Sequence, residues 1–266
     1  MNDYGNDLFK GTAYYYSRYR PLYPAALVRY LIEKFSLNGQ GHMLDLGCGT
    51  GQLAYRFTDW FDSILGIDPE REMIQEAKRF SKEIRADHLE WFNGDLFKYI
   101  NMETKSFKLV TIAKAFHWMD RAKVLDTLYD MVSDGGGIAI IDNYNPQQEK
   151  LLWQKKVDEV VKEWFGEERR AGSTTFSHPT VSYEELIAHS KFELETEQIQ
   201  PYEQVWDIDS IIGNLYSTSY GKLSFLKGKV DQFESHIKEE LLALNSKGIF
   251  KEEIHLSVKL AMKKNA

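Results

Sequence analysis

A cluster of glycines behind an acidic residue is the part of this 266-residue chain with the clearest chemical potential. Asp45 ends a short apolar run and is followed by Gly47, Gly49 and Gly51. Glycine adopts backbone angles that a Cβ atom forbids, and it lets a ligand approach the main chain. Amides at a helix N-terminus add hydrogen-bond donors and a partial positive field. Residues 43–54 therefore predict a buried strand, a tight ligand-binding turn and the start of a helix.

The spacing of the glycines separates two kinds of cofactor. A dinucleotide-binding turn has the pattern G-x-G-x-x-G, and Gln52 stands here in place of the last glycine. Asp-x-Gly-x-Gly-x-Gly instead resembles the first motif of the class I S-adenosylmethionine-dependent methyltransferases. The resemblance implies that the turn wraps the amino-acid part of this cationic cofactor, with Asp45 near its ammonium group. A glycine-rich turn without any ligand is the alternative for the motif. Cys48 is interpreted as a small residue that fits this cofactor turn, and a reactive thiol is its alternative role.

A second acid follows the next predicted strand, residues 63–67. Asp68 lies 21 residues beyond Gly47 (68 minus 47), where a Rossmann-type fold places an acid that accepts both ribose hydroxyls. Pro69 follows it and is included in the expected cofactor site. Since Asp before Pro is also a common helix start, a capping role for Asp68 is the alternative.

A third acid, Asp95, follows the predicted strand 88–93. The family resemblance implies that Asp95, or the amide of Leu96 beside it, reads the adenine amino group. An ordinary Gly-Asp turn is the alternative for this position alone. Asp45, Asp68 and Asp95 in this order predict S-adenosyl-L-methionine as cofactor and S-adenosyl-L-homocysteine as product.

The fourth predicted strand, residues 107–113, runs into the segment in which we expect the chemistry, because open α/β sheets bind ligands at the carboxyl ends of their strands. The Asn/Asp-Pro-Pro-aromatic string of amino-directed nucleic-acid methyltransferases is absent there. The Ala-x-His-Trp string resembles small-molecule enzymes of the trans-aconitate methyltransferase-like, or methyltransferase type 11, group, and implies Ala115 and Trp118 at the cofactor. His117 is a candidate general base or acceptor contact, and packing against the tryptophan is its alternative role.

Residues 1–23 are rich in tyrosine, and no helical or strand period fits them. They form either an arm that packs over the core or a lid whose rings attract a sulfonium by roughly 0.5–2 kcal/mol. The string Tyr-x-x-Tyr-Arg-Pro-x-Tyr-Pro, residues 16–24, resembles the N-terminal segment of many small-molecule methyltransferases and favours the lid. Tyr14 and Arg18 are the cofactor candidates of this segment, and Tyr19 is a candidate acceptor contact.

Strand and helix patterns alternate along the core and predict an α/β fold. The resemblance implies a Rossmann-like, seven-stranded, mostly parallel sheet with an antiparallel last strand, helices on both faces and a helical cap insertion. The predicted divisions are an N-terminal arm (1–23), a cofactor-binding core (24–145), a helix, loop and sixth strand (146–206), a helical cap insertion (207–248) and the last strand (249–266).

The cap has two interpretations, a buttress packed on the sheet or a cover that shapes the acceptor pocket. In the second interpretation Arg169, Tyr216 and Ser219 are candidate acceptor contacts, because they supply hydrogen-bonding groups in a region without a generic motif.

The formal net charge of −7 opposes a nucleic-acid or anionic-membrane partner, because phosphate binding needs clustered basic residues. One cysteine excludes an internal disulfide, and no Cys/His cluster has the spacing of a metal site. No leader or membrane-spanning pattern is present, so a cytoplasmic protein is expected, as a monomer or homodimer.

These observations predict an S-adenosylmethionine-dependent methyltransferase that transfers a methyl group in line to a small-molecule acceptor. The alternatives are an NAD(P)-dependent oxidoreductase, which Gln52 opposes, and a protein that binds S-adenosylmethionine without catalysis.

Overall fold

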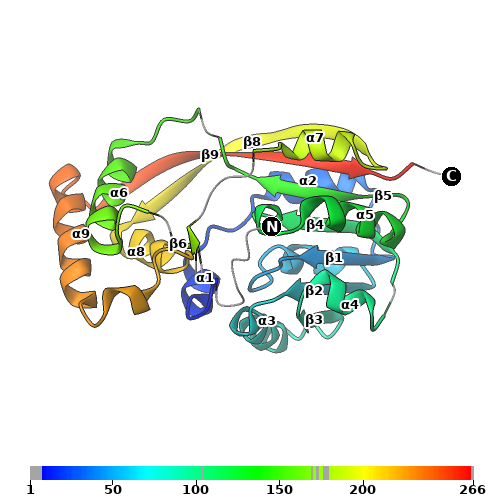
Figure 1. Cartoon of the computed structure of the whole chain (residues 1–266), viewed down its shortest axis with the longest axis horizontal. Coiled ribbons are helices and arrows are strands. Elements are labelled where there is room, and N and C mark those ends of the chain that lie inside the picture. Colours follow the sequence, from blue (N-terminus) through cyan, green and yellow to red (C-terminus); the bar gives the residue numbers. More distant parts are fainter. Residues whose placement is uncertain are drawn as a thin grey trace.

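The computed structural model describes residues 8–103, 105–145, 147–168, 170–171, 174–175 and 180–264. The main sheet of this part contains the strands β1 His42–Leu46, β2 Ser63–Asp68, β3 Leu89–Asn93, β4 Phe107–Ala113, β5 Val132–Asp142, β8 Glu193–Asp207 and β9 Ile249–Met262. Their order is β3-β2-β1-β4-β5-β9-β8, and β9 runs against the other six. The expected seven-stranded, mostly parallel sheet with an antiparallel last strand is confirmed (Figure 1).

Helices cover both faces of this sheet (Figure 1). One face carries α2 Ala25–Lys34, the 3-10 helix η1 Ala54–Trp60 and α3 Arg71–Ile84, and the other carries α4 Leu96–Ile100, α5 Arg121–Met131 and α7 Tyr183–Ala188. Neighbouring strand residues alternate between the two apolar clusters, as Met43 and Leu44 do. Because both faces are covered, the central strands are apolar along nearly their whole length.

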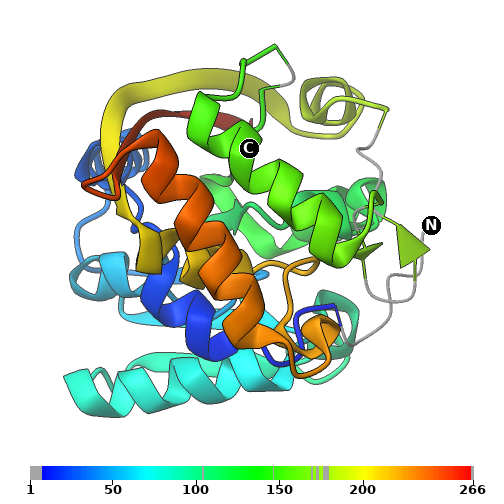
Figure 2. The same cartoon turned by 90° about the vertical axis from the view of Figure 1, so that its left-hand side faces the viewer.

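The cap is a group of helices at one end of the sheet (Figures 1 and 2). It contains α6 Leu152–Phe165, α8 Ile208–Tyr216, the 3-10 helix η3 Leu223–Leu226 and α9 Val230–Leu244, which share a third apolar cluster. The strands β8 and β9 pair out to Asp207 and Ile249, so they carry the chain from the sheet to the cap and back. The helical insertion between the last two strands is therefore present as expected.

The remaining elements are short: α1 Ala13–Tyr19, the 3-10 helix η2 Phe116–Trp118 and a hairpin of β6 Arg170–Ala171 with β7 Thr174–Thr175. The helix α1 corrects the expectation that no helical period fits the N-terminal arm. It lies between the cap and the core (Figures 1 and 2), bound to α3 through Ser17 and Glu76 and to the end of α8 through Arg20. In the part of the chain that the structure describes, no helix has the length and hydropathy needed to cross a bilayer.

Candidate functional site

The glycine turn after β1 is held against the end of β2. The amides of Gly47 and Cys48 donate to the carbonyl of Ile67, the last residue but one of β2, at 2.8 and 3.1 Å. Gly47 has a φ of +73°, and a Cβ atom on it would lie 2.5 Å from the Cβ of Ala115. Both the backbone angle and the close approach of the segment after β4 therefore require glycine here.

Asp45 places a carboxylate inside the protein beneath this turn. It is 2% exposed, and its Oδ1 accepts a hydrogen bond of 2.7 Å from the Thr111 hydroxyl on the neighbouring strand β4. Its Oδ2 is also buried and forms no hydrogen bond of normal geometry among the described residues, although the nearby Ala54 amide lowers the pKa of the carboxylate. Burial raises the pKa of Asp45 to about 7. A buried acceptor without a donor fits the ammonium group expected of the cofactor, because leaving it unpaired is costly.

Asp68 joins the turn to the start of α3. Its Oδ2 accepts from the Gly49 amide at 2.9 Å, and its Oδ1 accepts from the Glu70 amide at 2.8 Å. Burial raises the pKa of Asp68 to about 6. The N-cap of α3 is Glu70, whose side chain accepts from the Glu72 amide, so Asp68 is not the cap of that helix. Its ribose role stays a prediction.

The third acid lies at the next strand end, as the order of the sheet requires. Asp95 is the exposed N-cap of α4, and its Oδ1 accepts from the Lys98 amide at 2.8 Å. Leu96 beside it is buried, whereas Pro69 is exposed at the end of β2. Asp45 near the end of β1, Asp68 at the end of β2 and Asp95 just after β3 thus lie at the carboxyl ends of three adjacent strands.

The segment after β4 packs directly on the glycine turn. Ala115 is buried against Gly47, and the Trp118 ring lies 6.1 Å from that of Phe9 in an edge-on arrangement. His117 is half-buried with its ring 4.5 Å from that of Trp118, so its catalytic role stays a prediction beside a packing role.

The cysteine of the turn is buried. Burial raises the pKa of the Cys48 thiol well above its usual value, which keeps it neutral. This agrees with its interpretation as a small residue that fits the turn. Within the described residues, no group of three His, Cys, Asp or Glu side chains is placed to hold a metal ion.

One side of the helix α1 packs over the glycine turn. The Tyr16 carbonyl accepts from Gln52 Nε2 at 3.2 Å, and a Cβ atom on Gly49 would lie 3.3 Å from the Tyr16 ring. The guanidinium of Arg20, one helical turn later, lies over that ring at 5.0 Å from its centroid. Residues four apart share a helix side, so Tyr16 and Arg20 face the site together.

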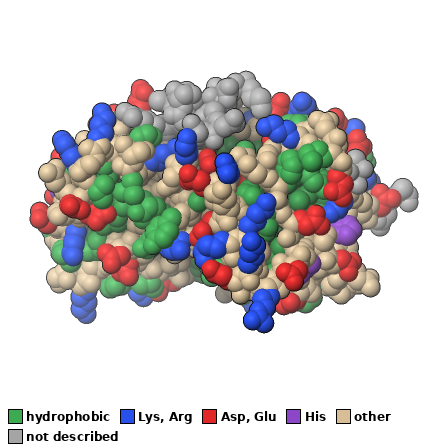
Figure 3. Space-filling view, turned by 90° about the horizontal axis from the view of Figure 1, so that it is seen from below, with side chains coloured by type: hydrophobic (Ala, Val, Ile, Leu, Met, Phe, Trp, Pro, Cys, Tyr) green, Lys and Arg blue, Asp and Glu red, His purple; other side chains and the backbone are tan. Residues whose placement is uncertain are grey.

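The structure does not bring Tyr14 and Arg18 to the turn, because they occupy another side of α1. Tyr14 is 57% exposed, and the Arg18 guanidinium lies 3.8 Å from its ring centroid. Arg18 also pairs with Glu76 of α3 at 3.0 Å, as Arg79 does at 2.8 Å. Figure 3, which views the molecule from below, shows acidic and basic side chains interspersed over that face.

The described acceptor candidates other than His117 lie around α8 and not at the glycine turn. The ring of Tyr19 packs so closely on Gly213 that a Cβ atom there would lie 2.3 Å from its Cγ. Tyr216 is 2% exposed within the cap cluster, and its hydroxyl donates to Glu234 at 3.0 Å. Ser219 is buried in the loop after α8. Arg169 lies outside the described residues.

Sequence reasoning missed Lys114, the residue that follows β4. It is a non-glycine residue with a φ of +53°, a conformation that is uncommon and costly for lysine. Burial lowers its pKa to about 8, with the nearby Arg20 adding to the effect. Its place directly after an apolar strand, at the edge where ligands bind, was a usable signal.

The fold is that of the class I Rossmann-like methyltransferases. Residues 43–136 match the family described as a methyltransferase domain. The comparisons thus confirm the expected class and fold.

Individual relatives are distant. The chain is similar to the Saccharomyces cerevisiae protein CRG1, named as an S-adenosylmethionine-dependent methyltransferase, with 27% identity over 47% of this chain and 43% of that protein. A Dictyostelium discoideum protein named as a methyltransferase is 23% identical over 89% of this chain and 86% of its own length. A solved methyltransferase structure from Anaeromyxobacter dehalogenans superposes with a TM-score of 0.61 at 20% identity, covering 91% of this chain and 96% of that one. The chain spans about half the length of the first curated relatives it matches.

Proposed function

We propose that the protein is an S-adenosylmethionine-dependent methyltransferase that acts on a small-molecule acceptor. The observation that carries the proposal is the buried Asp45 Oδ2, which lacks a donor beneath a turn built from glycine. A buried carboxylate would repel the anionic pyrophosphate of a dinucleotide, whereas a cofactor with an ammonium group supplies the missing donor.

The chain's own residues then have distinct tasks. Asp45 and the turn from Gly47 to Gly51 hold the amino-acid end of the cofactor, and Asp68 and Asp95 hold the ribose and adenine. Tyr16 covers the turn and excludes water from it. When bound, S-adenosylmethionine supplies a methyl group already activated by its sulfonium.

The remaining catalytic requirement is alignment of the acceptor with that methyl group. Holding two reactants in register supplies roughly 7–11 kcal/mol in favourable cases, so in-line transfer is proposed without a compulsory base. His117 is the candidate base where the acceptor must lose a proton. The net charge of −7 supports a small acceptor over a nucleic acid.

Calorimetry with S-adenosylhomocysteine tests the cofactor site. We expect binding by the wild type and a loss of about tenfold to a hundredfold in Asp45→Asn, because an amide cannot neutralise the ammonium group. Asp62→Asn is the matched control, since Asp62 lies at the opposite end of the strands, where its carboxylate accepts from the Gly41 amide. Absence of binding by the wild type would refute the proposal. Quenching of the protein's fluorescence by a reduced nicotinamide cofactor would favour an oxidoreductase instead.

Transfer of a labelled methyl group from S-adenosylmethionine into a metabolite extract tests the reaction itself. We expect a labelled small molecule with the wild type and none with a variant that does not bind the cofactor. Cofactor binding without transfer to any component of the extract would favour a non-catalytic binding protein.

A further inference from the structure

Two basic side chains near the carboxyl end of β4 have unused hydrogen-bond donors. Within the described residues, Arg20 makes one hydrogen bond, from Nη2 to the Ser217 carbonyl at 3.4 Å, and its buried Nε has no partner. The Lys114 ammonium forms neither a hydrogen bond nor an ion pair with any of the described residues. A guanidinium has five N–H donors and an ammonium three, so most of the donors here await acceptors.

The acids that face Lys114 are already engaged with other donors. Asp142 and Glu252 both raise the pKa of Lys114, against the effects of burial and of the neighbouring guanidinium. The Oδ1 atom of Asp142 accepts from the amides of the next two residues, at 2.7 and 3.1 Å. Glu252 accepts from the Trp206 indole at 3.0 Å and from the Gln154 side chain. Neither acid forms an ion pair with Lys114.

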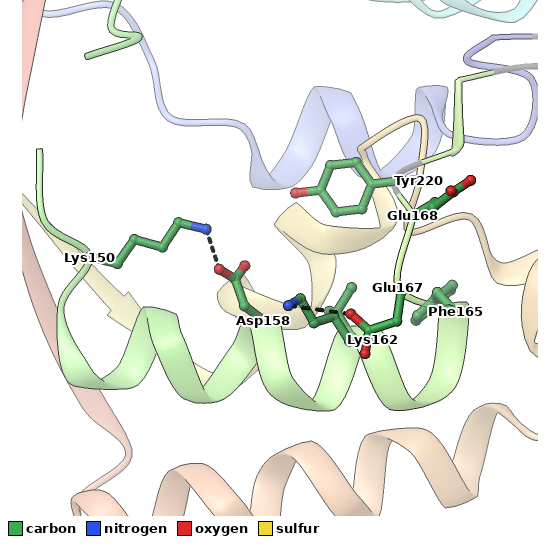
Figure 4. Close-up of a pocket in the computed structure, with 9 residues that line it drawn as sticks. Lys150, Asp158, Lys162, Phe165, Glu167, Glu168 and Tyr220 are labelled. Atoms are coloured by element: carbon green, nitrogen blue, oxygen red, sulfur yellow. Dashed lines mark hydrogen bonds and ion pairs between the residues drawn. The ribbon is translucent and has the colours of Figure 1, made fainter. Parts of the chain in front are cut away.

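A pocket in the cap shows the opposite arrangement (Figure 4). It is lined by residues of α6 and of the loop after it, together with Tyr220. Its basic groups have acidic partners within the pocket, Lys150 with Asp158 and Lys162 with Glu167. These two exposed lysines are thus paired with acids, whereas the half-buried Lys114 is not.

The position of Lys114 favours the acceptor over the cofactor. Arg20, the residue after α1, lies against the cap, because its guanidinium donates to the Ser217 carbonyl at the end of α8. The charges that act on Lys114 are those of Arg20, of Asp142 on β5 and of Glu252 on β9. Asp142 pairs with Ser257 of β9, and Glu252 lies five residues earlier in that strand (257 minus 252), nearer the cap. Lys114 therefore belongs to the part of the site between core and cap.

We propose that Arg20 and Lys114 form an anion-binding subsite that holds a carboxylate group of the methyl acceptor. The inference rests on the proposed methyltransferase function. A guanidinium fork matches the two oxygens of a carboxylate, and an ammonium adds a second charge. Two acids lie close to the two cations, so a monoanion suits the charge balance better than a phosphate dianion. The carboxylate is an anchor, and a different atom of the acceptor takes the methyl group.

The conformation and burial of Lys114 support this assignment. A lysine with a φ of +53° and a pKa lowered to about 8 is held at a cost to folding. Such strain and desolvation gather at functional sites, where a ligand of opposite charge restores the charged form.

Labelled-methyl transfer into a metabolite extract, followed by anion-exchange chromatography at pH 7, tests the anchor. We expect the labelled product of the wild type to be retained, because the anchoring carboxylate survives the reaction. Lys114→Met should lower the rate at which that labelled product forms by about tenfold to a hundredfold. Lys114→Arg should restore most of that rate. Lys108→Met, near the other end of β4, is the matched control and should change it by less than about twofold.

Calorimetry with S-adenosylhomocysteine on the same variants separates the acceptor from the cofactor. Lys114→Met should bind it within about twofold of the wild type. A parallel loss of cofactor affinity would assign the cations to the cofactor's own carboxylate and overturn the acceptor subsite. A neutral labelled product, or equal transfer by Lys114→Met, would overturn it as well. A wild type that neither binds nor transfers would remove the proposed function and this subsite together.

Discussion

The glycine-turn side of the site and its acceptor side are built in different ways. The turn side uses one continuous segment, residues 45–51, and the ends of the next two strands. The acceptor side, by contrast, collects its charged groups from four segments distant in the chain, at positions 20, 114, 142 and 252. The residues of the first region are thus close together in the sequence, whereas those of the second are brought together only by the fold.

The two regions also carry opposite electrostatic stress. Burial raises the pKa of Asp45 and Asp68 on the turn side and lowers that of Lys114 on the acceptor side. In each case burial disfavours the charged form. For Asp45 and Lys114, a ligand of opposite charge would offset that effect. In both regions, therefore, buried ionisable groups lower the stability of the free protein and favour ligand binding. The two effects can be measured separately in each region.

The largest effect is expected from Gly49→Val on the turn side. A side chain at a φ of +54° is strained, and its Cβ would press on the Tyr16 ring, so affinity for S-adenosylhomocysteine should fall more than about a hundredfold by calorimetry. Gly228→Val is the matched control, because Gly228 has a φ of +84° with open space around it. Equal loss in both variants would mean that strain alone, and not the site, is responsible.

Acid should weaken cofactor binding by a smaller factor. Asp45 and Asp68, with pKa values of about 7 and about 6, are ionised at pH 8 and largely protonated at pH 5.5. Binding at low pH must expel these protons, so affinity should fall about tenfold to a hundredfold over that interval. Calorimetry at both pH values measures the change, and Asp45→Asn should flatten it. A pH-independent affinity would contradict the buried carboxylate as the ammonium partner.

The acceptor side should show its cost in stability. The folded-state pKa of Lys114 lies below its unfolded value, so at pH 7 the charged form destabilises the protein, and the penalty disappears as pH rises from about 8 to above 10. Lys114→Met should therefore stabilise the protein at pH 7 by about 1–3 kcal/mol in urea unfolding, and less at pH 10. Lys108→Met should not. Destabilisation by Lys114→Met would show that the lysine supports the fold.

The smallest effect is expected from the outer side of α1. Arg18→Met removes a half-exposed ion pair with Glu76, so stability should fall by at most about 1 kcal/mol. Cofactor affinity should remain within about twofold of the wild type, in contrast to a substitution of Tyr16. A large loss of affinity in calorimetry would return Arg18 to the cofactor site.

The core elements were predictable because their signals are local. Apolar runs covered on both faces, such as β4, and glycines at fixed spacing after β1 leave few alternative interpretations. The limits of β5 were less predictable: the strand begins at Val132 and runs through residues 134–137, a Gly-rich stretch that is typical of a turn. Pairing of Phe107 with Val132 extends it, and no local pattern encodes that partner.

The helix α1 was missed for a related reason. A seven-residue helix is not stable alone, because few hydrogen bonds offset the cost of nucleation. Contacts with α3 and α8, such as Ser17 with Glu76 and Tyr19 with Gly213, hold it in place. The tyrosines of this segment are therefore evident from the sequence, but which of them face the site could not be predicted from it.

By itself, the amino-acid order determined the class of fold, the glycine turn and the succession of three acids, since each depends on residues within one strand and its following turn. Only the tertiary structure decided that Asp45 is half-satisfied by Thr111, that Tyr16 covers the turn, and that Arg20 lies near Lys114. Such neighbours meet because strand order and helix packing bring distant segments together, and burial then alters their charge. No spacing along the chain records that proximity.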